Sequence, residues 1–231
     1  MKKLGLIGGV GPESTIPYYR GIVYGVQKKQ NTPFFPPLVI ESLSCFEVIR
    51  MSLQNDRDGL TTYLLTGIRN LAAAGADIGA LACSTGHMVF DELQKQSPIP
   101  LISIVEPTCA QAKRQNLKKV GLLGTAATME GDYFKSPFCK AGIDVAIPQP
   151  ADRIYIADRI SHELDLGIME EKTARRLIEI AEELVKEQHV EAIILGCTEL
   201  PLLFQGQKLS VPVLDAMRLH IETLVNTILE E

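Results

Sequence analysis

The 231-residue sequence contains no tryptophan, and its aromatic residues amount to only 6%. It also lacks any block of Lys or Arg, and its net charge is −5 at pH 7. Nucleic-acid-binding surfaces combine clustered basic residues with aromatic rings on which bases stack, so this composition argues against a nucleic-acid partner. No apolar run approaches the ~18 residues that span a bilayer, so we expect no membrane partner either.

The sequence lacks the cysteine and histidine spacings of a metal site or a disulfide framework. None of the five cysteines lies in a CxxC pair and the four histidines are scattered, so we predict no metal ligands. An odd number of cysteines is typical of free thiols in a reducing cytoplasm. The N-terminal segment MKKLGLIGGVGP breaks into glycines after a short apolar run, which does not suit a signal peptide. We therefore expect a cytoplasmic protein.

Apolar segments of strand length alternate with longer segments of helical pattern along the whole chain. The predicted strands are 3–8, 37–42, 77–82, 100–105, 119–124, 143–148, 191–196 and 211–216. The predicted helices are 12–29, 57–75, 86–96, 106–116, 128–141, 153–166, 170–188 and 216–230. Near-continuous apolar strands alternating with helices indicate an α/β fold with parallel sheets.

The two halves of the chain repeat one another. KLGLIGG (3–9) matches KVGLLGT (119–125), and DIGALACST (77–85) matches EAIILGCTE (191–199). The spacing agrees as well, since 75 residues separate Gly8 from Cys83 and 73 separate Gly124 from Cys197. We therefore predict two pseudo-symmetric, doubly wound parallel-sheet domains. The first comprises residues 1–103 plus 212–231, and the second comprises residues 104–211.

Each half places one cysteine where a buried strand ends, followed by hydroxyl residues that open a helix. Ligands of open parallel sheets bind beyond these strand ends. We expect Ser84 or Thr85 to cap the first helix and Thr198 the second, so that each helix N-terminus lowers a thiol pKa and binds an anion. A single cysteine at a strand end is more often structural. Two at equivalent positions, Cys83 and Cys197, suit the transfer of a proton between opposite faces of one carbon.

The residues that follow the first predicted strand of each half are further candidates for the site. Val10 follows the first strand, and Thr125 and Thr128 occupy the matching region of the second half, so we expect all three to face the site. Ser14 and Thr15 suit packing or capping within the first helix. His87 is close to Cys83 in sequence, but on the expected helix it points away, which favours a structural role.

At this point the sequence resembles the aspartate/glutamate racemase family over its whole length. GLIGGVGPESTIPYYR (5–20), CST (83–85) and GCTEL (196–200) resemble the signatures of that family. The resemblance implies two α/β domains with the active site in the cleft between them, a homodimer, and catalysis without pyridoxal phosphate or metal. It also implies that Cys83 and Cys197 are the acid/base pair, the first serving the D-enantiomer and the second the L-enantiomer.

Several positions bear on the substrate that the resemblance implies. Glu199 resembles the aspartate racemase branch and can either raise the pKa of Cys197 or relay its proton. Ser84 replaces the usual asparagine. Some aspartate racemases bind the side-chain carboxylate of the substrate with an arginine in the first half and a lysine in the second. Arg50, with Ser52 nearby, is the candidate for the first position here, whereas Asp165 stands where the lysine is expected. These differences weaken the case for aspartate.

The function predicted from the sequence is a cofactor-independent racemase of aspartate, glutamate or a broader set of amino acids. The candidate substrate-binding residues are Val10, Arg50, Ser52, Ser84, Thr85, Thr125, Thr128, Thr198 and Glu199. A hydantoin racemase, a maleate isomerase or a decarboxylase of the same superfamily is the enzymatic alternative, although a decarboxylase needs only one thiol. A non-catalytic module that binds a small carboxylate is the alternative from another class.

Overall fold

The computed structural model describes residues 1–230, which divide into two compact units. The first unit comprises Met1–Ile104 together with the C-terminal residues from His220 onward, and the second comprises Val105–Leu219. Each unit contains one four-stranded parallel sheet, and the two sheets have the same strand order. The structure thus confirms the α/β class and the repeat.

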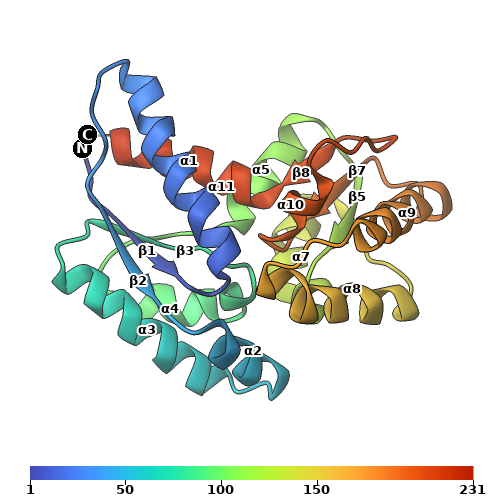
Figure 1. Ribbon diagram of the computed structural model, residues 1–231, viewed down its shortest axis with the longest axis horizontal. Coiled ribbons are helices and arrows are strands. Elements are labelled where there is room, and N and C mark those ends of the chain that lie inside the picture. Colours follow the sequence, from blue (N-terminus) through green and yellow to red (C-terminus); the bar gives the residue numbers. More distant parts are fainter. Residues whose placement is uncertain (231) are drawn as a thin grey trace. The chain divides into compact units, whose positions relative to one another are not determined.

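The first sheet has the order β2-β1-β3-β4 and is covered by helices on both faces (Figure 1). Its strands are β1 (Leu4–Gly8), β2 (Leu38–Ser42), β3 (Ile78–Leu81) and β4 (Leu101–Ile102). Helices α1 (Pro12–Gln30) and α11 (Ala216–Leu229) lie on one face and α3 (Arg57–Ala73) on the other. Every residue of β1 and β3 is buried, as expected for central strands of a parallel sheet.

Glycines allow close packing on both faces of this sheet. A Cβ on Gly67 of α3 would lie 2.9 Å from Ile7 Cδ1, so the helix approaches β1 more closely than any larger residue would permit. On the other face, Cβ atoms on Gly21 and Gly25 of α1 would lie 2.9 and 2.8 Å from side chains of α11. Close packing of this kind tolerates no added methyl group without movement.

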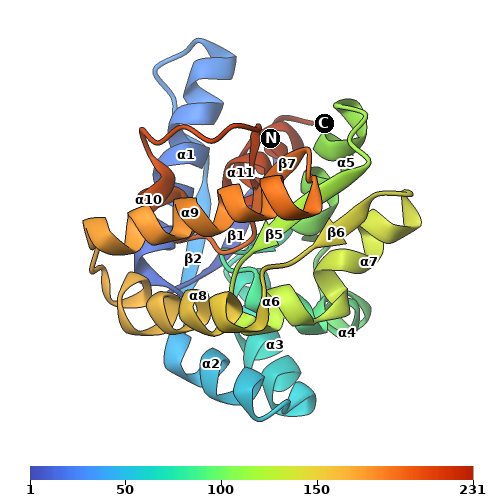
Figure 2. The same cartoon turned by 90° about the vertical axis from the view of Figure 1, so that its right-hand side faces the viewer.

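The second sheet repeats the topology with the order β6-β5-β7-β8. Its strands are β5 (Lys119–Leu123), β6 (Asp144–Ala146), β7 (Ala192–Leu195) and β8 (Val213–Asp215). Helices α8 (Pro150–His162) and α9 (Glu171–Gln188) lie side by side over one face (Figure 2). Their apolar residues form one core cluster with those of β5 and β7.

The helix that follows the last strand of each sheet packs in the other unit. Helix α5 (Val105–Arg114) follows β4 but contacts β8 and α7 (Asp132–Lys140) of the second unit. Helix α11 follows β8, and from His220 onward it belongs to the first unit. The expected return to the first half at residue 212 is therefore too early, because β8 pairs with β7 and Leu219 is the last residue of the second unit.

Some helices differ from those that the sequence predicts. Two short helices that we did not predict are α2 (Cys45–Leu53) and α10 (Leu200–Phe204). Three predicted helices are each divided into two: η1 (Thr85–Val89) with α4 (Phe90–Gln96), α6 (Ala126–Glu130) with α7, and α8 with η2 (Leu164–Leu166). Gly131 separates α6 from α7 with an extended backbone conformation. Within residues 1–230 no helix is long and apolar enough to cross a membrane.

Candidate functional site

Cys83 and Cys197 occupy the same topological position in the two sheets. In each sheet the two central strands are followed in the chain by outer strands on opposite sides of the sheet. The point between the two central strands is therefore the switch point at which open α/β sheets bind ligands. In the first unit the last backbone hydrogen bond between the segments of the two central strands runs from Ala82 N to Ile7 O (2.9 Å). In the other it is the bond from Gly196 N to Leu123 O (2.7 Å). Each cysteine is the next residue, and each is buried, with 5% of its surface exposed.

The Cys83 thiol lies among apolar side chains of the first unit. Val10, after β1, belongs to the same core cluster, so the structure brings these two predicted residues together. A Cβ on Gly86 would lie 3.1 Å from Cys83 Sγ, which shows how closely η1 folds back over the thiol. The neighbouring Ser84 is 4% exposed, and its hydroxyl has no hydrogen-bond partner among residues 1–230. A buried polar atom of this kind is available to a ligand.

The hydroxyl groups at the start of α1 bond locally, which confirms the packing and capping roles expected of them. Ser14 Oγ lies 2.9 Å from Gly11 O and 3.2 Å from Ala82 O, so it joins α1 to the end of β3. Thr15 Oγ1 accepts a hydrogen bond from Gly9 N and donates one to Gly11 O. Both bonds fix the turn after β1.

His87 has a structural role in a buried network, as expected. Its Nε2 accepts a hydrogen bond from Ile104 N (3.1 Å), so Nδ1 carries the proton and donates to Cys83 O (2.9 Å). Burial lowers the pKa of His87 to about 4, which keeps the ring neutral. The backbone position of Cys83 is therefore fixed by a neutral histidine.

His220 extends this network from α11. Its Nε2 donates to Ile102 O (3.1 Å), and its Nδ1 accepts from the hydroxyl of Tyr18 (2.8 Å). Burial, with a smaller contribution from His87, lowers the pKa of His220 to about 3. The two rings are 6.4 Å apart in an edge-to-face arrangement. Together they connect α1, α11 and the segment after β4 to the residue that carries the first thiol.

Cys197 lies beside a carboxylate. Its thiol donates a hydrogen bond to Glu199 Oε2 (2.9 Å), and Thr198 Oγ1 donates to the same oxygen (3.0 Å). Glu199 is 3% exposed and Thr198 is 2% exposed. Burial, followed by the negative charges of Glu199 and Asp165, raises the pKa of the Cys197 thiol well above its ordinary value. Cys197 therefore rests as a thiol with a direct route for its proton to Glu199.

This finding corrects the expected effect of the helix N-termini. Ser84 makes no capping bond to η1, and α10 begins only at Leu200, beyond Thr198. Burial of the thiol, followed by the charge of the neighbouring Glu199 carboxylate, raises the pKa of Cys197, whereas a helix N-terminus was expected to lower it. Thr85, which opens η1, is partly exposed.

Thr125 and Thr128 form a support beneath the second cysteine. Thr125 Oγ1 caps α6 by accepting from Thr128 N (3.2 Å). Thr128 is fully buried, and its hydroxyl lies 2.8 Å from that of Tyr133. A Cβ on Gly196 would lie 3.1 Å from the methyl group of Thr128. Thr128 thus packs under the turn that carries Cys197, and a role for it in substrate binding stays a prediction.

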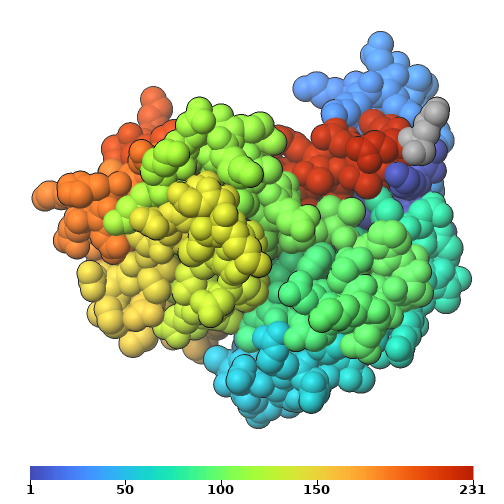
Figure 3. All heavy atoms as spheres, turned by 180° about the vertical axis from the view of Figure 1, so that it is seen from behind, coloured from blue at the N-terminus to red at the C-terminus, as the bar shows by residue number. Residues whose placement is uncertain are grey.

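Arg50 and Ser52 lie on α2, which is part of the light-blue surface at the bottom of Figure 3. The guanidinium of Arg50 is about half exposed and donates to Glu47 Oε2 (2.7 Å) and Gln54 Oε1 (3.0 Å). To bind a substrate carboxylate, Arg50 would have to leave both partners. Ser52 Oγ lies 3.3 Å from the sulfur of Met88, so it joins α2 to η1.

Asp165, which stands where the family resemblance leads one to expect a lysine, interacts with the second thiol and its neighbouring carboxylate. It lies in η2, between α8 and α9, and it interacts electrostatically with Glu199 and Cys197. Burial, followed by the charge of Glu199, raises the pKa of Asp165 to about 7. Only the position of η2 in the fold could reveal this, because 32 residues separate Asp165 from Cys197 in the sequence.

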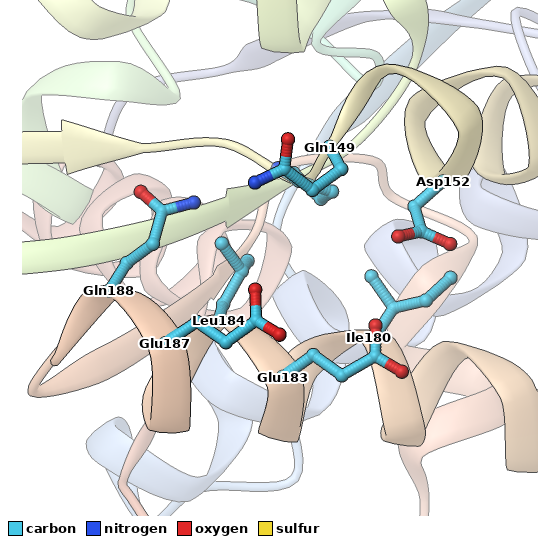
Figure 4. Close-up of a pocket in the computed structure, with 8 residues that line it drawn as sticks. Gln149, Asp152, Ile180, Glu183, Leu184, Glu187 and Gln188 are labelled. Atoms are coloured by element: carbon cyan, nitrogen blue, oxygen red, sulfur yellow. The ribbon is translucent and has the colours of Figure 1, made fainter.

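The pocket shown in Figure 4 belongs to the second unit, and Cys197 does not line it. It lies between the start of α8 and the C-terminal half of α9. Asp152, Glu183 and Glu187 contribute carboxylates to it, and Arg176 pairs with the first two of them. Among residues 1–230, no group of three or more Cys, His, Asp or Glu side chains could hold a metal ion.

Comparisons with known proteins identify the family and match the fold. The model of the Asp/Glu/hydantoin racemase family matches residues 7–224. The structure superposes on that of a Yersinia pestis protein with a TM-score of 0.88 and 34% identity over the whole of both chains. An aspartate racemase homologue from Pyrococcus horikoshii OT3 gives a TM-score of 0.83 and 31% identity over the same extent. The broad specificity amino-acid racemase RacX of Bacillus subtilis is 24% identical over 98% of each chain.

Proposed function

Because the chain belongs to the Asp/Glu/hydantoin racemase family, we propose that it is a cofactor-independent amino-acid racemase with a two-base mechanism. Cys83 and Cys197 exchange protons with opposite faces of one substrate α-carbon. The observation that carries the proposal is their equivalence: each follows the last backbone hydrogen bond between the two central strands of its sheet, beside the switch point. A single structural cysteine would have no reason to recur at this position of the repeat.

The environment of Cys197 suggests how its proton moves. When Cys197 acts as the acid, its S–H bond breaks, the proton goes to the α-carbon, and a thiolate remains. When it acts as the base, its thiol proton first passes to Glu199 Oε2, 2.9 Å away, and the thiolate then takes the α-proton. In that direction the thiol of Cys83 delivers the other proton and becomes a thiolate, and the proton on Glu199 must then reach Cys83 through solvent to restore the starting state. The reverse reaction begins with Cys83 as the thiolate and ends when Glu199 returns its proton to the Cys197 thiolate.

The negative charge that develops on the substrate carboxylate needs hydrogen-bond donors in a dry environment. Ser84 suits this role because its hydroxyl is buried and has no partner among the described residues. Thr85, at the start of η1, is the second candidate donor. Val10, in the same cluster as Cys83, excludes water from the thiol.

The substrate is an α-amino acid, and the relatives point to two ranges of side chain. The P. horikoshii protein is an aspartate racemase homologue, whereas RacX is a broad specificity racemase. Aspartate, glutamate and neutral amino acids are therefore all included in the test below. We further propose that the protein works as a homodimer in the cytoplasm. Size-exclusion chromatography with light scattering tests the oligomeric state.

The test is racemisation in heavy water. A two-base enzyme releases product that carries deuterium at the α-carbon while the recovered substrate keeps its protium, because each face has its own monoprotic thiol. Cys83→Ser and Cys197→Ser should each abolish racemisation, and Cys139→Ser, which alters an exposed thiol on α7, is the matched control. Full activity in either of the first two variants would refute the mechanism. The absence of exchange with every amino acid would instead favour a binding module.

A further inference from the structure

Cys83 stands between two peptide groups whose oxygens are both held by side chains. The carbonyl oxygen of Ala82, on the N-terminal side, lies 3.2 Å from the hydroxyl of Ser14. The carbonyl oxygen of Cys83 itself accepts a hydrogen bond from Nδ1 of His87 (2.9 Å). Because a peptide group is planar and stiff, a bond to its oxygen restricts the orientation of the whole group. The direction in which the first thiol projects is therefore restricted from both sides.

The imidazole ring of His87 can serve as this donor in one orientation only. Its Nε2 accepts from Ile104 N (3.1 Å), which requires the proton to be on Nδ1. The ring also stacks on that of Phe90, with 4.9 Å between the ring centroids and 6° between the planes. His87 is 2% exposed, so both hydrogen bonds lie in the interior of the first unit. The ring thus forms a rigid connection between Ile104 and the carbonyl group of Cys83.

The peptide group that His87 holds joins two residues of the proposed site. On one side is Cys83, whose thiol exchanges a proton with the substrate, and on the other is Ser84. The Ser84 hydroxyl is buried and has no hydrogen-bond partner among residues 1–230, so it is available to the substrate carboxylate. A rotation of this one peptide group would displace the thiol and the hydroxyl together.

The second half of the repeat has no equivalent of this histidine. The residue four positions after Cys197 is Pro201, whereas His87 is four positions after Cys83. Proline has no side-chain donor, and the oxygen of Cys197 instead accepts from the backbone amide of Leu200 (3.3 Å). Removal of the His87 donor should therefore affect the first thiol and leave the second unchanged.

We propose that His87 is a positioning residue for proton transfer at Cys83. Its Nδ1–H holds the Cys83–Ser84 peptide group in the orientation that the transfer requires, and the ring does not itself exchange a proton with the substrate. This inference rests on the proposed racemase function. A misplacement of about 1 Å at a reacting group can cost about a hundredfold in rate, so loss of the bond should lower kcat by about tenfold or more and change KM by less than about threefold.

Two substitutions separate the two hydrogen bonds of the ring. His87→Asn places an amide N–H at the position of Nδ1, so it retains the donor to Cys83 and loses the acceptor for Ile104. His87→Gln places an amide oxygen near the position of Nε2, so it retains the bond to Ile104 and loses the donor to Cys83. Each variant loses one buried hydrogen bond, which makes the two a matched pair for stability.

We expect His87→Gln to lower kcat by about tenfold or more, and His87→Asn to keep it within about threefold of the wild type. His162→Gln alters an exposed ring on α8 of the second unit and should leave kcat within about twofold. Circular dichroism gives the folded fraction of each variant, to which the rates are normalised. Equal losses of kcat in the two His87 variants would overturn the inference.

Isotope effects show whether one proton transfer has been slowed. The probes are the α-deuterated L- and D-forms of whichever of aspartate, glutamate and alanine the wild type racemises fastest. Each thiol removes the α-hydrogen of one enantiomer, so slower transfer at Cys83 limits the rate in both directions. In His87→Gln the substrate isotope effect on kcat/KM should rise for one enantiomer and fall for the other. A shift in the same direction for both enantiomers would overturn the inference, since partial unfolding alone changes neither.

Thiol labelling separates this inference from the proposed function, because it needs no turnover. Alkylation of Cys83 and Cys197 by iodoacetamide at pH 8 is followed by peptide mass spectrometry in the folded proteins. Because η1 folds back over the Cys83 thiol, the labelling rate of Cys83 should rise about fivefold or more in His87→Gln and stay within about twofold in His87→Asn. The rate of Cys197 should not change.

If the wild type racemises no amino acid, the proposed function fails, but the placement of Cys83 by His87 stands on this difference in labelling. If the two His87 variants label Cys83 at equal rates, that placement is refuted, whatever the activity of the wild type.

Discussion

Acid should destabilise the first unit through its two buried histidines. The pKa of His87 is about 4 in the folded protein, whereas an exposed histidine in the unfolded chain titrates near 6.5. Between these two pH values the unfolded chain binds more protons, so the free energy of unfolding falls as the pH falls. For His87 alone the loss is about 2 kcal/mol at pH 5 and approaches about 3 kcal/mol below pH 4. His220, whose folded pKa is about 3, adds a loss of the same sign.

The structure explains why protonation is unfavourable. A proton on Nε2 of His87 would face the N–H of Ile104, which now donates to that nitrogen. The assay is urea-induced unfolding followed by circular dichroism between pH 8 and pH 4.5, for the wild type and His87→Gln. The glutamine can still accept from Ile104 but does not titrate, so the variant should be less stable at pH 8 by about 1–3 kcal/mol and lose less stability in acid. A variant that loses as much stability in acid as the wild type would refute this reasoning.

Three further predictions concern the second thiol and the packing of the helices. Burial raises the pKa of Cys197 most, and the charge of Glu199 raises it further; Glu199→Gln removes only this second contribution. Alkylation of Cys197 by iodoacetamide, followed by peptide mass spectrometry, should therefore reach its half-maximal rate at a lower pH, and an unchanged midpoint would contradict a contribution from Glu199. Gly196→Ala places a Cβ 3.0 Å from the carbonyl oxygen of Leu123 and should lower kcat more than tenfold by displacing the adjacent thiol, and a fully active variant would exclude this. Gly25→Val introduces methyl groups where α1 meets α11 and should lower the free energy of unfolding by about 1–3 kcal/mol, measured by urea titration, with no loss expected if the two helices were loosely packed.

The sequence predicts the strands well because their signal is local. Buried parallel strands are nearly continuous apolar runs, and each of the eight predicted runs contains a strand. The helix α2 was not predicted, because its nine residues are too few for a clear apolar period. The second domain boundary was wrong, because the pairing of β8 with β7 is a long-range contact with no local signature.

The site was predictable only as far as the repeat extends. The repeat identifies Cys83 and Cys197 as equivalent positions, and both follow the central strands as expected. It says nothing about the direction of a pKa shift, which depends on where the Glu199 carboxylate lies and how deeply it is buried. Nor could it join His87 to His220 or bring Asp165 near Glu199, since these groups meet only when the chain has folded.

The exchange of α5 and α11 has a consequence for how this protein can be divided. A fragment that ended after β4 would lack α11, and with it the His220 partner of Tyr18 and the side chains that fill the groove at Gly21 and Gly25. Its α1 would be left with an open apolar face. An autonomous first half would therefore have to be a permuted chain with residues 220–230 joined ahead of residue 1. Lys2 N already donates a hydrogen bond to Ile228 O, so the new junction would need only a short linker.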